Sequence, residues 1–175
     1  MLGTINKILK KILGDKSEKD VQEISPIVDK INIIYNELKG LSNDQLRSKT
    51  AGLKAIIRER ISGLEGEIRT LKSKIEADPN MDIESKEAIY DEVDRKEKEI
   101  NSTIETVLEE ILPEAFAIVK ETARRFKEDA PLRVTPTEFD KDLASRRNNV
   151  SVEGDQAVWQ NTWMAAGNEI KWEIV

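Results

Sequence analysis

The first thirteen residues repeat apolar side chains with the spacing of an amphipathic helix. The apolar positions are Leu2, Ile5, Ile8, Leu9, Ile12 and Leu13. Three lysines fall on the opposite side of the same helix, namely Lys7, Lys10 and Lys11. This pattern predicts a basic amphipathic helix over residues 1–14, with Gly14 at its end.

Two clear helix starts follow within residues 25–60. Ser25 before Pro26 predicts an N-cap and the first position of a helix. Ser42 with Gln45 three residues later predicts a capping box, in which side chain and backbone groups satisfy each other at the start of a longer helix. We therefore expect two helices in this part of the chain.

Residues 60–105 have the pattern of a helical hairpin. Apolar residues alternate spacings of four and three, as in the seam of a coiled coil, at Ile57, Ile61, Leu64, Ile68, Leu71 and Ile75. The Asp78-Pro79-Asn80 segment interrupts the pattern, and a second long helix is expected from about Ile83. Its less regular apolar stripe consists of Ile89, Val93, Ile100, Ile104, Val107 and Ile111. A link this short predicts two long antiparallel helices.

The segment 113–147 predicts two further helices. Pro113 suits the first position of a helix, which Pro131 closes off. Thr135, with Glu138 three residues later, predicts the cap of a short helix that ends near Arg147.

After residue 148 the period changes from that of a helix to that of a strand. Turn candidates at Gly154-Asp155 and Gly167-Asn168 separate short alternating runs, which predicts an antiparallel β-meander over residues 148–175. All three tryptophans lie in it: Trp159, Trp163 and Trp172. The expected fold class is mainly α with a small β part, formed by a long antiparallel helical hairpin and this C-terminal meander.

Composition excludes several kinds of chemistry. The 175 residues contain no cysteine and no histidine, so disulfides, thiolate sites, histidine-based catalysis and His-ligated zinc are ruled out. The net charge is −6, and no concentrated basic face is visible outside the N-terminus. An acidic body of this kind argues against nucleic-acid binding.

No enzyme chemistry is expected within this chain. Neither a G-x-x-x-x-G-K-[ST] loop nor a G-x-G-x-x-G loop occurs, so no phosphate cradle of the usual type is present. The Asp91-Glu92-Val93-Asp94 segment spells a magnesium-binding Walker B-like sequence, but it falls in a predicted helix rather than after an apolar strand. We therefore expect no catalytic, cofactor-binding or metal-binding residue.

The basic N-terminal helix is the candidate contact site. Its members are Leu2, Ile5, Lys7, Ile8, Leu9, Lys10, Lys11 and Ile12. The lysines would attract an acidic membrane at about 1 kcal/mol per basic residue, with the apolar side in the bilayer interface. The alternative is that the apolar stripe packs on the rest of the chain or on a second copy, as most such stripes do.

Two blocks resemble the N-terminal region of the SecA family of preprotein translocase motors. One runs from the basic helix through Leu41-Ser42-Asn43-Asp44-Gln45-Leu46 and Lys49-Thr50-Ala51, and the other from Leu112 to Arg125, which begins Leu-Pro-Glu-Ala-Phe-Ala. Two stretches depart from the common family pattern and look like insertions, at about 60–105 and 127–171. Both look like the form of the family found in Bacteroidetes.

The resemblance implies a fragment, the N-terminal piece of a helicase-like motor domain. The family's Q-motif glutamine, P-loop lysine and magnesium ligands have no counterparts here, so ATP and magnesium would bind residues beyond Val175. In the family the front helix is associated with acidic phospholipids, the SecYEG channel and the dimer interface. A cytoplasmic protein attached peripherally to the inner membrane is therefore expected, with preproteins as further partners.

Two hypotheses remain open at the level of sequence. The first is the N-terminal, non-catalytic part of a SecA motor, which couples ATP hydrolysis to preprotein export. The second is a free-standing coiled-coil adaptor or scaffold without nucleotide chemistry. The adaptor should have a satisfied C-terminal β segment, whereas a piece of a motor should expose tryptophan or an unpaired strand edge there.

Overall fold

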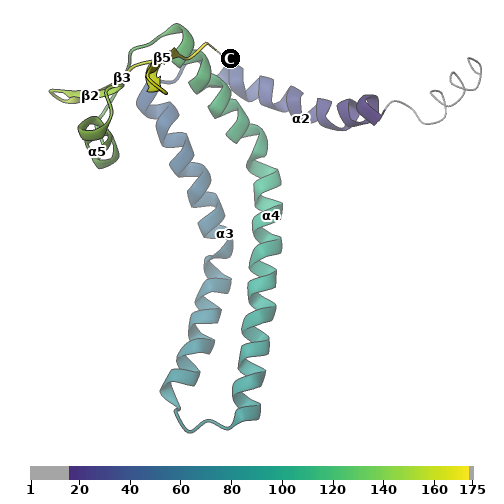
Figure 1. Ribbon diagram of the computed structural model, residues 1–175. Coiled ribbons are helices and arrows are strands. Elements are labelled where there is room, and N and C mark those ends of the chain that lie inside the picture. The colour runs from purple at the N-terminus through teal and green to yellow at the C-terminus, as the bar shows by residue number, and fades with distance from the viewer. Residues whose placement is uncertain (1–15, 174–175) are drawn as a thin grey trace, which may run out of the picture.

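The computed structural model describes residues 16–173, and the predicted helix over 1–14 lies outside them. Three helices dominate this part of the chain: α2 (Lys16–Leu38), α3 (Asn43–Ala77) and α4 (Ile83–Glu128). α3 and α4 form a long antiparallel hairpin, and α2 extends sideways from the end at which the chain enters and leaves it (Figure 1). We call this end the base. The mainly helical fold class is confirmed.

The ends of the hairpin helices follow the local signals in the sequence. Ser42 caps α3, its hydroxyl accepting from the Gln45 N–H while the Gln45 side chain accepts from the Ser42 N–H, so the predicted capping box is confirmed. α3 ends at Ala77 before the predicted break. Asp82 then caps α4 through the Ser85 N–H.

An apolar seam holds the two arms of the hairpin together. Its buried members are Ile61 and Ile68 of α3 with Val93 and Val107 of α4, all from the predicted stripes. Ion pairs flank this seam on the outer arm, including Arg60 with Glu110 and Lys72 with Glu97. These pairs are exposed, so the seam rather than the charges carries the pairing.

Two predicted helix starts are wrong, because the helices run through their prolines. α2 begins at Lys16 rather than after Ser25, and α4 continues through Pro113. Each proline leaves a carbonyl four residues earlier without its helical donor. Gln22 and Glu109 hold those carbonyls and are exposed, so water can satisfy them. Strong helix formers on both sides then continue each helix.

The C-terminal strands are antiparallel as predicted, but they form two sheets rather than one meander. The first sheet has the order β1-β3-β2, from β1 (Leu132–Val134), β2 (Val150–Glu153) and β3 (Gln156–Trp159). β1 precedes the short helix α5 (Glu138–Arg146) and was not predicted. The second sheet pairs β4 (Thr162–Ala165) with β5 (Asn168–Lys171).

The predicted cap of α5 is also shifted. Thr137, not Thr135, is the N-cap, and its partner in the capping box is Asp140. Thr135 instead donates from its N–H and its hydroxyl to Asp44 of α3, at 2.9 Å each. The side chain that resembled a helix cap therefore connects β1 to the hairpin.

Candidate functional site

Three helices meet at the base around a small apolar core. Its buried members are Leu38, Leu46, Leu53, Ala117 and Ile118, one from α2 and two each from α3 and α4. Partly buried residues of α2, among them Ile31, Ile34 and Tyr35, pack against this cluster. The block that resembled the SecA family, Leu112 to Arg125, therefore supplies the α4 side of the base.

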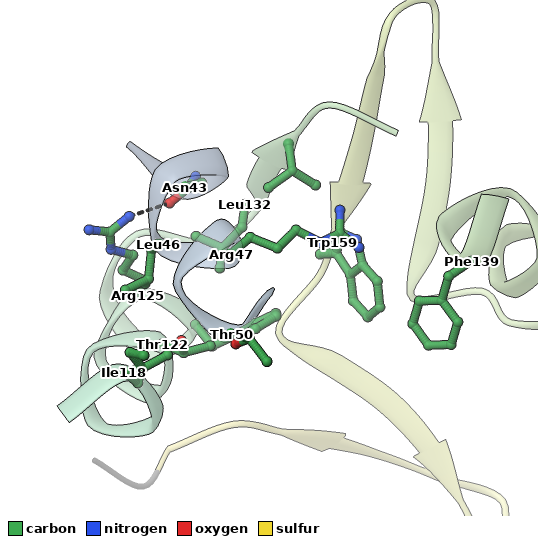
Figure 2. Close-up of a pocket in the computed structure, with 12 residues that line it drawn as sticks. Asn43, Leu46, Arg47, Thr50, Ile118, Thr122, Arg125, Leu132, Phe139 and Trp159 are labelled. Carbon is green, nitrogen blue, oxygen red and sulfur yellow. Dashed lines mark hydrogen bonds between the residues drawn. The ribbon is translucent and has the colours of Figure 1, made fainter. Parts of the chain in front are cut away.

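A buried arginine on α4 organises the turn between α2 and α3. Arg125 donates from Nη2 to the carbonyls of Leu41 at 2.8 Å and Leu38 at 3.2 Å. Its Nη1 donates to the Asn43 side chain at 2.8 Å, the contact that is dashed in Figure 2. One guanidinium thus satisfies backbone carbonyls at the end of α2 and a side chain at the start of α3.

Glu121 balances the buried charge of Arg125 from one turn earlier on α4. Its carboxylate accepts from Arg125 Nε at 2.7 Å and from Arg124 at 2.9 and 3.0 Å, and it is fully buried. Burial acts to raise the pKa of Glu121, but the two arginines lower it by more. The net pKa is below the usual range of a glutamate.

A second buried carboxylate joins α5 and β3 to the hairpin. Asp140 accepts a two-pronged contact from Arg47 of α3, at 2.8 Å to each oxygen, and a hydrogen bond from the Trp159 indole at 3.1 Å. Asp140 also completes the capping box of α5 by accepting from the Thr137 N–H and hydroxyl. Figure 2 shows Arg47 reaching across from α3 toward Trp159.

The pKa of Asp140 is strongly displaced. Burial would raise it, but the hydrogen bonds from Arg47 and Thr137 together with the charge of Arg47 hold it well below the ordinary value of an aspartate. The same contact raises the pKa of Arg47. Both groups therefore stay charged at neutral pH.

Aromatic rings fill the space between α4 and the strands. Phe126 lies with its ring centroid 6.5 Å from those of Trp159 and Trp172, and Trp163 lies 6.3 Å from Trp172. A cavity of about 280 Å³ lies between these rings and α3, bounded by Arg47, Thr50 and Thr122 among others (Figure 2). Four polar side chains around this cavity are already hydrogen-bonded within the fold, namely Asn43, Arg47, Thr122 and Arg125.

An apolar face remains open beside this aromatic cluster. On α4, Phe116 and Val119 are 58% and 66% exposed. Trp163 on β4 and Trp172, directly after β5, are 40% and 39% exposed. Val119, Trp163 and Trp172 line one hollow of about 420 Å³. We call these four residues the open apolar face. Exposed apolar patches of this kind mark interaction surfaces.

The structure can test only some of the site predictions made from the sequence. All eight candidate contact residues, from Leu2 to Ile12, lie outside the described residues. The Asp91–Asp94 segment lies within α4, as predicted. Among residues 16–173, no cluster of carboxylates is arranged to hold a metal ion, and no helix is long and apolar enough to cross a membrane.

Sequence inspection missed the buried charges. Asp140 carries a local signal, because it stands three residues after the cap Thr137. No local signal identifies its partner Arg47, which is 93 residues away. The same holds for Arg125, whose partners at the turn lie more than 80 residues earlier.

Comparison with known proteins gives consistent matches. The family model described as the SecA DEAD-like domain matches residues 9–137. A protein named "Protein translocase subunit SecA" from Porphyromonas gingivalis is 46% identical over 170 residues, 97% of this chain and 15% of that protein.

Proteins of the same name from two further bacteria agree with this result. Flavobacterium psychrophilum has one that is 46% identical over 98% of the chain, and Cytophaga hutchinsonii one that is 43% identical over 95%. Because these alignments cover nearly all the chain, they include both predicted insertions. The chain spans about 15% of the length of each relative. No solved structure matches it.

Replacing Asp140 by Asn is expected to destabilise the chain by roughly 3 kcal/mol near neutral pH, because the charge of Arg47 loses its buried partner. The pKa of Asp140 is lower in the folded chain than in the unfolded chain, where it is about 3.9. The ionised carboxylate therefore contributes its full stabilisation above that pH, and this stabilisation is lost as the pH falls below it. The free energies of unfolding of the variant and the unmodified chain are measured by urea unfolding followed by Trp fluorescence. Their difference should shrink as the pH falls from about 5 to about 2.

The matched control is Lys141→Gln, whose side chain pairs with the exposed Glu138. Its effect should stay within about 0.5 kcal/mol at every pH. A difference between Asp140→Asn and the unmodified chain that is independent of pH would contradict the assigned ionisation.

Proposed function

Since this chain belongs to the SecA family, we propose that it forms the N-terminal, non-catalytic part of a motor that couples ATP hydrolysis to preprotein export through the SecYEG channel. The relatives are named protein translocase subunits, and the chain spans about 15% of their length. ATP and magnesium would bind in the remainder of such a protein, since these residues contain no phosphate-binding loop.

The open apolar face is the observation that carries this proposal. Phe116 and Val119 follow the helical spacing of one α4 face, away from the buried Ala117 and Ile118. The β4-β5 pair has only two strands, and two-stranded sheets are marginal in water without further packing. Both features fit a surface that the rest of a larger domain covers. A complete adaptor would be expected to cover it, and the family matches do not favour that alternative.

A second part of the proposal concerns the membrane. Lys7, Lys10 and Lys11 would attract acidic phospholipid, and the apolar side of the same segment would enter the interface. This attachment would place the protein in the cytoplasm at the inner membrane, next to the channel. Contact with a second copy is the competing use of the segment, and nucleic acid is not a proposed partner.

Phe116→Ser combined with Val119→Ser tests the covering of the open apolar face. In the 175-residue chain both side chains are mostly exposed, so stability should change by no more than about 0.5 kcal/mol. In a longer protein that carries this chain and has the length of its relatives, the same pair should cost about 3 kcal/mol, because two buried apolar side chains are lost.

The measurement is urea unfolding of both proteins, with ATP-dependent preprotein transport into channel-containing vesicles as a second reading in the longer one. Lys98→Ser on the exposed hairpin serves as the control in both. An equal effect of the double substitution in the two proteins would rule out a covered face. Absence of transport by the unmodified longer protein would contradict the motor function itself.

Reversing the charge of Lys7, Lys10 and Lys11 to Glu should abolish binding to vesicles rich in phosphatidylglycerol. Three attractive charges, each worth about 1 kcal/mol near the surface, are replaced by repulsive ones. Vesicle flotation measures the bound fraction, and Lys72, Lys74 and Lys86 changed to Glu near the hairpin tip form the control. Equal flotation of the charge-reversed and unmodified chains would contradict the membrane contact.

A further inference from the structure

α2 carries one continuous apolar stripe that the body of the protein covers only in part. The stripe keeps helical spacing along the whole helix: Val21, Ile24, Ile27, Val28, Ile31, Ile34, Tyr35 and Leu38. Its C-terminal half packs on the core at the base, with Leu38 buried. The N-terminal half continues on the same side of the helix beyond that core.

The N-terminal half of this stripe lies open. Val21, Ile24 and Val28 are 62%, 54% and 43% exposed. Figure 1 shows α2 extending away from the hairpin in this region, so neither α3 nor α4 covers it. A helix usually buries such a stripe. The open half therefore needs a partner.

We propose that residues 1–13 of the same chain dock on this open stripe as an antiparallel helix. Leu2, Ile5, Leu9 and Ile12 are separated by three, four and three residues, and so are Val21, Ile24, Val28 and Ile31. An antiparallel arrangement places these residues opposite one another in four pairs, from Leu2 beside Ile31 to Ile12 beside Val21.

The connection between the two segments permits this arrangement. Gly14 and Asp15 alone separate residues 1–13 from the start of α2 at Lys16. Links of roughly two to five residues join antiparallel helices. Thirteen helical residues extend roughly 20 Å, and in this register they would lie along residues 20–32 of α2, a stretch of the same length. The docked segment would end where the core at the base begins to cover the stripe.

The charges are compatible with docking. Residues 1–13 contain three lysines and no acidic residue. Residues 16–30 of α2 contain three lysines and four acidic residues, Glu18, Asp20, Glu23 and Asp29. Lys7, Lys10 and Lys11 would stay on the side away from α2, because they fall opposite the apolar stripe of their own helix.

Docking gives the N-terminal segment two mutually exclusive uses. Its apolar stripe can cover α2 or enter a bilayer, but it cannot do both. This consequence, unlike the docking itself, rests on the membrane contact proposed above. An acidic bilayer would then release residues 1–13 from α2 and leave Val21, Ile24 and Val28 open to another apolar surface.

The absence of native cysteine makes a disulfide test direct. Leu9→Cys with Ile24→Cys should form an intramolecular disulfide on mild oxidation of the chain, and Ile5→Cys with Val28→Cys is a second pair from the same register. Lys7→Cys with Ile24→Cys is the control, since Lys7 faces away from the stripe. The yield is read from the shifted monomer band and from cross-linked peptides.

For both designed pairs, the yield of disulfide-linked monomer should be about tenfold higher than for the control pair. This yield should not change when the protein is diluted about a hundredfold, because the contact is intramolecular. Yields equal to that of the control would overturn the proposal. A disulfide-linked dimer that disappears on dilution would also overturn it and assign the stripe to a second copy.

Vesicles of phosphatidylglycerol separate the docking from the membrane contact. Their addition before oxidation should lower the yield of the designed pairs. If the chain floats with the vesicles but its disulfide yield is unchanged, α2 and the bilayer do not compete for residues 1–13. A chain that cross-links in solution but does not float would support docking and contradict the membrane contact.

Discussion

The buried charge of Arg125 is the constraint on which the base of the molecule depends. A guanidinium removed from water is tolerated only when its donors are satisfied, and the structure supplies partners from all three long helices. Glu121 neutralises it on α4, and Asn43 accepts from it at the start of α3. The carbonyls of Leu38 at the end of α2 and of Leu41 in the following turn also accept from it. These contacts fix where α2 ends and how the hairpin begins. The apolar core packs beside these contacts.

The outer hairpin and the base are stabilised in different ways. Toward its tip the hairpin relies on a narrow apolar seam with exposed ion pairs, which add little stability. At the base, the buried carboxylate of Asp140 joins α3, α5 and β3, and the buried carboxylate of Glu121 pairs within α4 with Arg125, whose guanidinium reaches α3 and the end of α2. The parts that match the common family pattern therefore meet at the base, and the predicted insertion of residues 60–105 forms the outer arm. The open apolar face lies on the base side.

Much of the helical architecture could be predicted from sequence, because its signals are local. The capping box at Ser42, the break after Ala77 and the seam spacing each depend on residues within one or two turns, and all three are confirmed. The errors share a cause that a local pattern cannot reveal. Pro113 was expected to start a helix, yet burial of neighbouring apolar residues at the base holds α4 continuous through it. The unexpected strand β1 exists because β3 pairs with it, and Arg47 was not recognised because its partner Asp140 lies 93 residues away. The candidate contact residues at the N-terminus remain a prediction.

Glu121 and Arg125 are expected to act as one unit in holding the base together. A double-mutant cycle with Glu121→Gln and Arg125→Met measures their coupling, with urea unfolding followed by circular dichroism for the helices and Trp fluorescence for the strands. Each single change should cost about 3 kcal/mol, because it leaves a buried group unpaired. The double change should cost less than the sum of the two by roughly 1–3 kcal/mol, and the two signals should shift together. Effects that add to within about 0.5 kcal/mol would contradict the account, since independent residues behave in that way.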